Sequence, residues 1–386
     1  MLMVGVNQVI MLSLNMVIIA SMIGAGGLGY DVLTSLRRLD IGAGLEAGMA
    51  IVALAIALDR VSQAAATRGP IHPDRARRYL LAAGALILAT WLGSLAWPAL
   101  ARWPEAWTLS TGPFWGALVA WINVHYFDTL EAAKNAVVLN LMVPVKRFLL
   151  AQPWPWVILL TGLAGLRLGG ARLAATCVAL PLFVVVTGQW ENAMLTVYLT
   201  AISVLIAALI GIPLGLASAT RPQLWRLVEA GIDTLQTLPS FVYLIPVVML
   251  FRVGDFTAML AIVLYALAPA VRYTAQGIIQ VPEQYLEAGT ASGCTRRQLL
   301  WRVRVPLALP QILLGINQTI MLAISMLVIT ALVGTRDLGQ EVYVALAKAD
   351  IGRGLVAGLC VAFIAITADR LVSAATDRVR RRVGIG

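Results

Sequence analysis

Few residues in this chain are able to hold a metal ion or form a disulfide. The 386 residues include three cysteines and two histidines. Cys177 and Cys360 fall in apolar segments and Cys294 in a polar one, while His72 and His125 lie far apart. Zinc sites need several such ligands close together, and disulfide frameworks need paired cysteines. The sequence therefore predicts neither a metal site nor a disulfide framework.

Lysine is also scarce, which bears on nucleotide binding. The only lysines are Lys134, Lys146 and Lys348, and none lies in a glycine-rich stretch. The phosphate-binding loop of ATPases has the pattern Gly-x4-Gly-Lys-Ser/Thr, because its backbone N–H groups and its lysine hold the phosphates. The protease patterns His-Glu-x-x-His and Gly-x-Ser-x-Gly are missing as well. We therefore expect no catalytic residues and no cofactor bound by this chain.

Charged side chains of either sign are few, and long apolar runs take their place. Only 12% of the residues are charged and 60% are hydrophobic, with a mean hydropathy of +0.85. A helix needs about 20 mostly apolar residues to cross a bilayer. We predict an all-α polytopic membrane protein with about 10 transmembrane helices. They lie near residues 5–23, 44–58, 79–100, 153–168, 173–188, 194–218, 238–252, 256–276, 307–333 and 352–368.

The net charge of +10 comes mainly from arginines in the polar connections. Five groups lie within residues 60–78, 167–172, 221–226, 296–304 and 378–382. If the spans alternate from an inside N-terminus, all five groups fall on one side, as the positive-inside rule predicts. Both termini are then cytoplasmic, and the basic charge reflects membrane topology. The expected partner is a lipid bilayer and not a nucleic acid.

Residues 281–306 form a polar segment between two apolar ones. Glu283, which follows a proline, favours the start of a helix. Gly289 and Gly293 are predicted to interrupt that helix. Short connections between helices are the norm, so a segment of this length with helices of its own indicates a partner outside the membrane. The alternative is a loop whose glycines only turn the chain.

A second short helix is predicted within the same segment. Thr295 and Gln298 have the spacing of a capping box. This helix is expected to end before Pro306, because the residue preceding a proline avoids helical geometry. Two short helices joined at a glycine elbow would present a compact knob to a groove on another subunit.

Residues 5–60 and 315–370 form an internal repeat with a constant offset of 310 and no gap. Because the offset contains eight predicted spans, both copies have the same orientation, unlike the inverted repeats of many secondary transporters. The matched positions include Gly5/Gly315, Asn7/Asn317, Gln8/Gln318, Gly24/Gly334, Leu28/Leu338, Gly29/Gly339, Asp40-Ile41-Gly42/Asp350-Ile351-Gly352 and Asp59/Asp369.

The repeat predicts how the chain is organised. The second copy follows directly after residues 281–306, whereas the first has nothing equivalent before it. We interpret the chain as the end of one unit joined to one complete unit, a tandem fusion without its front; a genuine short form is the alternative. The predicted parts are two spans in 1–61, a cytoplasmic linker in 62–78, three spans and a long external segment in 79–189, and a core in 190–386.

Several of these stretches resemble permease subunits of ATP-binding-cassette importers of the glycine betaine/proline type. They are residues 22–29, 236–251, 315–322 and 338–352. The pattern Glu-Ala-small-x3-Gly-x9-aliphatic-x-aliphatic-Pro in residues 287–306 is similar to the cytoplasmic coupling loop of these permeases. The resemblance covers residues 5–60 and about 190–375.

The resemblance implies a type I importer transmembrane domain in a bacterial inner membrane. A periplasmic substrate-binding protein would deliver the solute, and nucleotide-binding ATPase subunits would bind ATP and Mg²⁺. A second permease unit, another copy or a missing half, would complete the pathway. The expected substrates are compatible solutes such as glycine betaine, proline or choline.

The resemblance assigns ATPase coupling to Glu287, Ala288, Gly289, Gly293 and Pro306. Among them, Glu287 is expected to meet a basic or hydrogen-bonding group of the ATPase subunit. A solvated helix carboxylate is the alternative for this residue.

Four further residues, Thr237, Phe241, Tyr243 and Asn317, are candidates for the substrate pathway. Aromatic faces hold quaternary ammonium groups, although aromatic residues on apolar helices more often pack in the core or against lipid. Permeases for another small amino acid or amine, such as histidine, are the alternative. A secondary transporter is less favoured, because the span centres are nearly free of ionisable residues.

The second copy of the internal repeat departs from the family pattern at one site. Arg336-Asp337 replaces a glycine pair, Gly26-Gly27, of the first copy. We expect a solvated surface ion pair there, which contributes little to stability; a gating or docking contact is the alternative.

Overall fold

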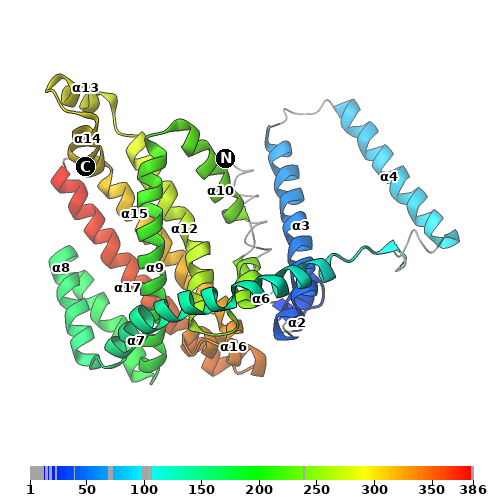
Figure 1. The fold of residues 1–386 in the computed structure, drawn as a ribbon, viewed down its shortest axis with the longest axis horizontal. Coiled ribbons are helices and arrows are strands. Elements are labelled where there is room, and N and C mark those ends of the chain that lie inside the picture. Colours follow the sequence, from blue (N-terminus) through cyan, green and yellow to red (C-terminus); the bar gives the residue numbers. More distant parts are fainter. Residues whose placement is uncertain are drawn as a thin grey trace.

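The computed structural model describes residues 24–38, 40–67, 73–97, 107–237 and 240–383, with Pro104 and a few isolated positions before residue 24. Within these residues the chain forms helices and contains no strand, so the all-α prediction is confirmed (Figure 1). The α-helices are α2 Leu28–Arg38, α3 Ile41–Thr67, α4 Pro73–Ala96, α6 Gly112–Val137, α7 Val143–Leu150, α8 Trp154–Val186, α9 Trp190–Ala219, α10 Pro222–Thr237, α11 Leu244–Phe251, α12 Asp255–Ile279, α13 Glu283–Ala291, α14 Arg296–Gln298, α15 Val305–Thr330, α16 Leu338–Lys348 and α17 Ile351–Val383.

Short non-α segments join several of these helices. Two are π-helical, η2 Val138–Met142 and η4 Leu299–Arg304, and two are 3₁₀-helical, η3 Ser240–Tyr243 and η5 Ala331–Val333.

The centre of the bundle is formed by α9, α12 and α15, which pack through small residues. A Cβ at Gly211 of α9 would lie 2.7 Å from Ala270 Cβ of α12, and one at Gly315 of α15 would lie 2.7 Å from Tyr273 Cβ. Membrane helices lack a hydrophobic drive to associate, so close backbone approach through glycine strengthens their van der Waals packing. This packing sets the positions of the ends of α9, α12 and α15, from which the connecting segments project.

Seven helices among the described residues are long and apolar enough to cross a membrane. Multi-pass membrane placement is thereby supported, but the predicted count of about ten is not confirmed. Residues 5–23 lie mostly outside the described residues. The described part of the predicted span 238–252 forms η3 and the short α11, which together are shorter than the about 20 residues that a crossing helix needs. The predicted spans 153–168 and 173–188 both fall within α8.

Helix α8 folds back on itself and is a hairpin of two arms. Gly170, with φ +80°, is the one non-helical residue inside it. A Cβ at Gly162 would lie 2.8 Å from Val178 Cγ2, and Thr161 Oγ1 donates a hydrogen bond to Cys177 O at 3.1 Å. The two predicted segments are therefore adjacent antiparallel helices, joined at a residue type that adopts positive φ without strain.

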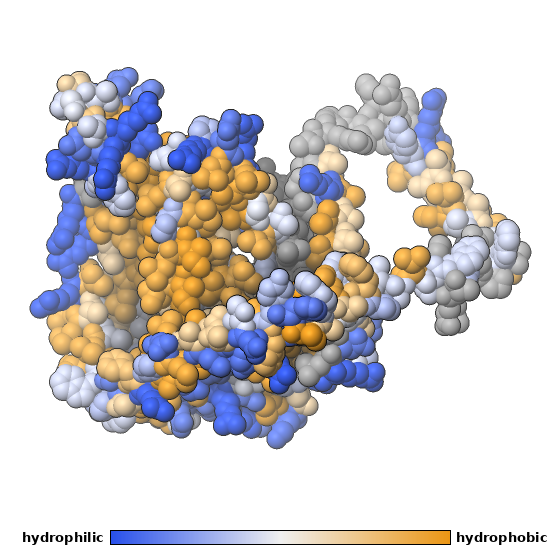
Figure 2. Space-filling view, in the orientation of Figure 1, coloured by the Kyte–Doolittle hydropathy of each residue, from blue (hydrophilic) through white to orange (hydrophobic). Residues whose placement is uncertain are grey.

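The two ends of the bundle differ in what they carry. Figure 1 places the C-terminal ends of α3, α9, α12 and α17 at one end, with α13 and α14 beyond them; we name this the loop end. Helices α6 and α7 run across the opposite end (Figure 1). Figure 2 shows an apolar band on the bundle between hydrophilic residues at both ends, as expected for a membrane-embedded protein.

Residues 128–140 are part of the transverse α6–η2 segment. Leu130, Val137 and Leu141 are half-buried there, whereas Ala133 is exposed. Lys146 of α7 forms an ion pair of 2.8 Å with Asp255 at the start of α12, which ties the transverse segment to the core.

The two copies of the internal repeat adopt the same local structure. Helices α2 and α16 have bounds that differ by the offset of 310, and α3 and α17 start at matching residues. Asp40 Oδ1 accepts a hydrogen bond from Ala43 N at 3.1 Å, and Asp350 Oδ1 accepts one from Arg353 N at 3.1 Å. The same sequence pattern thus caps the second helix of both copies.

Candidate functional site

The connection between α12 and α15 forms a projecting knob at the loop end of the molecule. Its first helix, α13, begins at Glu283 after Pro282, as the sequence predicts, and it places an acidic residue in its first turn. The prediction for Gly289 was wrong: this residue lies inside α13 and does not interrupt it. Its function is one of packing, because a Cβ there would lie 2.7 Å from Leu299 Cδ1 of η4.

Gly293 forms the elbow that ends α13. Its φ is +79°, in the left-handed region where glycine is unstrained. Cys294 N donates to Gly289 O at 3.0 Å, and Gly293 N donates to Thr290 O at 2.9 Å. These two bonds form a Schellman motif, which satisfies carbonyls at the helix end and reverses the chain. The predicted glycine elbow is therefore present at Gly293.

The second helix begins with the predicted capping box. Gln298 N donates to Thr295 Oγ1 at 3.3 Å, and Thr295 N donates to Gln298 Oε1 at 2.8 Å. The prediction that this helix ends before Pro306 was wrong: α14, η4 and α15 follow one another without a break. Pro306 follows directly on the π-helical η4, which lies where the missing proline N–H would interrupt the α-helical hydrogen bonds.

The knob leaves its predicted coupling residues accessible. Glu287 and Ala288 are exposed on α13. Tyr285 of α13 and Trp301 of η4 are 44% and 55% exposed, which is high for aromatic residues. A hollow of about 670 Å³ is lined by residues of α12, α13 and α15 and by Arg380 of α17. The result is a solvent-facing projection with apolar and acidic groups.

The predicted pathway aromatics are buried together in the core. Phe241 is fully buried and Tyr243 is 5% exposed, and both belong to the main hydrophobic cluster. The Tyr243 hydroxyl donates to Leu235 O, and its ring packs edge-to-face on Tyr265 with 5.9 Å between centroids. In this conformation neither residue is open to a solute. Thr237 ends α10, and its side chain lies outside the described residues.

Asn317 lies on α15 and pairs with a residue that the sequence analysis missed. Its Nδ2 donates to Asp369 Oδ1 of α17 at 2.7 Å, and its own Oδ1 is buried without a partner. A signal for Asp369 was present, because the repeat conserves both members of the pair as Asn7 and Asp59. An ionisable residue in a membrane span usually pairs with a polar group.

Arg336 and Asp337 do not form the predicted surface ion pair. Among the described residues no ion pair joins them, and Asp337 is 2% exposed. Its Oδ1 instead accepts a hydrogen bond from Gln340 N at 3.1 Å and caps α16. Arg336 is exposed. Burial of the carboxyl group at the start of a helix, where the dipole favours negative charge, explains the difference.

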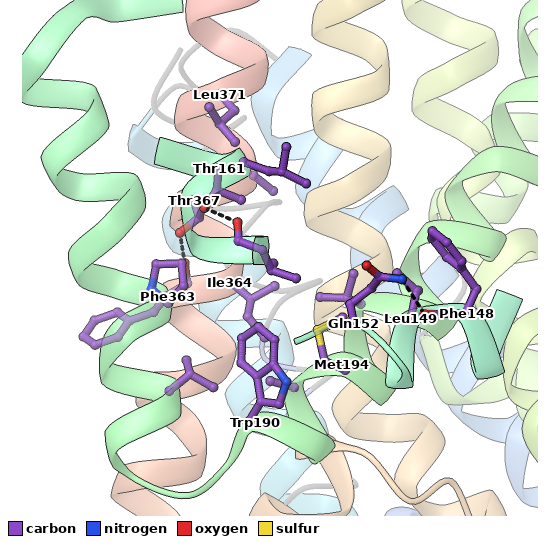
Figure 3. A pocket seen from close by; sticks show the side chains of 17 residues that line it. Phe148, Leu149, Gln152, Thr161, Trp190, Met194, Phe363, Ile364, Thr367 and Leu371 are labelled. Atoms are coloured by element: carbon purple, nitrogen blue, oxygen red, sulfur yellow. Dashed lines mark hydrogen bonds between the residues drawn. The ribbon is translucent and has the colours of Figure 1, made fainter. Parts of the chain in front are cut away.

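An apolar cavity of about 460 Å³ lies between α7, α8, α9 and α17 (Figure 3). Figure 3 shows Trp190, Met194 and Ile364 on one side of this space and Phe148 and Leu149 on another. Polar side chains at its wall bond to their own helices, as when Gln152 Nε2 donates to Phe148 O at 3.0 Å and Thr367 Oγ1 to Phe363 O at 2.7 Å. The cavity is suited to apolar groups and not to a charged solute.

The comparisons with known proteins agree with this architecture. Residues 211–383 match the family described as "Binding-protein-dependent transport system inner membrane component". That region includes the knob and most of the core. The glycine betaine/proline betaine transport system permease protein ProW of Escherichia coli strain K12 is 34% identical over 266 residues, which cover 68% of this chain and 74% of ProW. The chain belongs to this family.

Two further relatives are similar to this chain. The trimethylamine N-oxide transport system permease protein TmoV of Pelagibacter ubique is 37% identical over 100% of this chain and 56% of TmoV. The glycine betaine/carnitine transport permease protein GbuB of Listeria monocytogenes is 40% identical over 50% of this chain and 68% of GbuB. The chain thus spans little more than half the length of TmoV.

Among solved structures, the MetNI methionine ABC transporter in inward facing conformations covers 49% of this chain and 93% of its own. Its TM-score of 0.42 and identity of 24% make it a likeness too distant to support an argument.

Proposed function

We propose that this chain is a permease subunit of an ATP-driven importer, with a type I transmembrane domain in a bacterial inner membrane. The observation that carries this proposal is the knob of residues 281–306, an exposed pair of short helices beyond the membrane-spanning bundle. A membrane protein with no outside partner would gain nothing from exposing Tyr285 and Trp301 there. Family membership supports the same function.

The knob is the surface on which a separate nucleotide-binding subunit would act. Glu287 and Ala288 would contact a groove of that subunit, and the Gly289 packing and the Gly293 elbow would transmit its movement to η4 and α15. ATP and Mg²⁺ would bind to the partner subunit. A periplasmic substrate-binding protein would dock at the opposite end, near α6 and α7. The knob and both termini would be cytoplasmic.

The substrate would be a small methylated amine or a related compatible solute. The relatives are named for trimethylamine N-oxide, for glycine betaine with proline betaine, and for glycine betaine with carnitine. Most of these solutes carry a quaternary nitrogen, which aromatic faces bind well. In an open state of the pathway, Phe241, Tyr243 and Asn317 would line the route, together with Thr237.

The division of the chain follows from the same proposal. Residues 1–61 would be the last part of one permease unit and 62–78 a cytoplasmic linker. Residues 79–189 would supply the first spans of the second unit, and 190–386 its core. A second permease unit would complete a two-fold pathway.

The deciding test is capture of the nucleotide-binding subunit by the full chain in detergent. We compare the wild type with Glu287→Arg, and use Glu191→Arg as control, since Glu191 is exposed at the start of α9 at the opposite end. Wild type and control should capture the ATPase, and Glu287→Arg should lose at least about 90% of it, which corresponds to about 1.4 kcal/mol. Equal capture by all three variants would remove Glu287 from the interface, and capture by none would contradict the proposed function.

A further inference from the structure

The corner between α16 and α17 has a counterpart within the same chain, the corner between α2 and α3. The two corners share a packing contact between their helices. A Cβ at Gly44 would lie 3.4 Å from Ser35 Cβ, and one at Gly354 would lie 3.3 Å from Ala345 Cβ. These are matching positions at the offset of 310. The first corner therefore shows what the second is built to contact.

The α2–α3 corner is covered by α6 and α11. A Cβ at Gly42 would lie 2.5 Å from Gly112 O at the start of α6, and one at Gly48 would lie 2.9 Å from Ile245 Cδ1 of α11. Met249 Cε lies 3.4 Å from the Cβ position of Gly44, so this side chain enters the corner itself. All three glycines are buried. We name the covering surface, made of the start of α6 with Ile245 and Met249, the α6–α11 face.

The α16–α17 corner carries glycines at the same three positions but has no such cover. Gly352 is exposed, and a Cβ at Gly358 would meet no atom within 4 Å. Ile351 and Leu355 are 84% and 62% exposed. A hollow of about 620 Å³ lies at the corner, lined by residues of both helices and their connection. Its position matches the one that Met249 fills in the first corner.

Polar ties distinguish the two corners. Glu46 of α3 accepts a hydrogen bond from Gly112 N at 2.6 Å, and Arg37 of α2 donates to the Tyr343 hydroxyl at 2.7 Å. Their counterparts at the offset of 310 are Val356 and Ala347. The second corner thus lacks counterparts of these two ties, and its own ion pair, Arg353 with Glu341 at 2.7 Å, lies within the corner. Close packing over its glycines is an interaction available to it.

We propose that the α16–α17 corner binds the α6–α11 face of a second copy of this chain, with Met249 of that copy in the hollow and Ile245 against Gly358. The proposal rests on the proposed function, because it specifies the surface through which a second permease unit joins. One α6–α11 face accommodates one corner, so the second copy must release its own α2–α3 corner. The contacts of the α2–α3 corner within one chain are then replaced by the matching contacts of the α16–α17 corner from the other chain, as in domain swapping.

Cross-linking in native membranes tests this contact. In a full chain with Cys177, Cys294 and Cys360 replaced by alanine, Ile245→Cys is combined either with Gly358→Cys or with Gly48→Cys. A short thiol cross-linker should join 245 to 358 between two chains and give a dimer band. It should join 245 to 48 within one chain, which is the positive control. An intact control with no 245–358 dimer would overturn the proposal and indicate that lipid covers the corner.

Two bulky substitutions make the test specific. Gly358→Leu adds its side chain to open space, so folding is unchanged, and it should abolish a dimer joined through Met249→Cys and Gly354→Cys. Gly48→Leu collides with Ile245, weakens the internal cover and should increase the same dimer severalfold. A dimer band insensitive to both changes would be a random collision product. ATPase capture through α13 is measured on the same membranes, so absence of the 245–358 dimer with capture retained would overturn the corner contact alone.

Discussion

At the scale of single residues, Asp337 shows how burial changes the chemistry of a group. Removal of its carboxyl group from water raises its pKa from 3.8 to about 6, although the hydrogen bond from Gln340 N acts in the opposite direction. Its Oδ2 is buried without a hydrogen-bond partner. The ionised form is therefore held in the folded protein at a cost in stability.

The sign of the resulting pH dependence follows from linkage. An acid with a raised pKa in the folded state binds a proton there more tightly, so stability is greatest below pH 3.8 and falls as pH rises to about 6. Asp337→Asn keeps an oxygen for Gln340 N but does not titrate. The stability of the wild type relative to this variant should rise by about 1 kcal/mol from pH 7 to pH 5. Thermal unfolding in detergent at both pH values measures it, and a difference that stays constant would contradict the assignment.

The sequence contained a signal that Asp337 caps a helix, but the neighbouring Arg336 favoured a different interpretation. Arg336 next to Asp337 favoured a surface ion pair, yet Asp337 with Gln340 three residues later has the spacing of a helix start. Thr295 and Gln298 have the same spacing and were interpreted correctly. Local caps can be predicted from a few residues, whereas burial depends on what the rest of the chain packs over them, as with Phe241 in the core.

At the scale of elements, the junction between α13 and η4 depends on the absence of a side chain at Gly289. Gly289→Val places a branched side chain against Leu299, where a Cβ already lies at 2.7 Å, and should push α13 away from η4. We expect ATPase capture to fall about tenfold, or about 1.4 kcal/mol, with the bundle intact. Thr290→Val is the matched control, because Thr290 is exposed and already branched. Capture lowered equally by both would show that the contact with Leu299 is not responsible.

Elements were predictable where the signal was local. The beginning of α13 and its Gly293 elbow follow from residue types, and so does the capping box. The continuation of the helical stretch through Pro306 was not predictable, because a proline in a helix interior usually ends or kinks the helix. The division of the predicted span 238–252 into η3 and α11 was likewise set by tertiary packing, because Phe241 and Leu244 are drawn into the core.

At the scale of the whole molecule, arginine positions predict which ends of the helices lie together, but not how deep each helix reaches. Each arm of the α8 hairpin has about 16 residues and spans about 24 Å, less than the roughly 30 Å of a bilayer core. Arg378 Nη1 near the end of α17 donates to Arg167 O near the hairpin tip at 2.8 Å. This bond draws the tip toward the loop end.

Thiol accessibility therefore decides whether the hairpin crosses the membrane. In a chain with its three cysteines replaced, Arg172→Cys at the tip should react with a membrane-impermeant maleimide only in inverted vesicles, as should Ser292→Cys in the knob. Asp128→Cys on the transverse α6 should react in intact spheroplasts. All three positions are exposed. Long arginine side chains can reach the interface from a short span, so a tip on the knob side is physically consistent with arms of this length. Labelling of Arg172→Cys from the α6 side would instead make α8 a re-entrant hairpin and would reduce the membrane-crossing segments of the second unit by two.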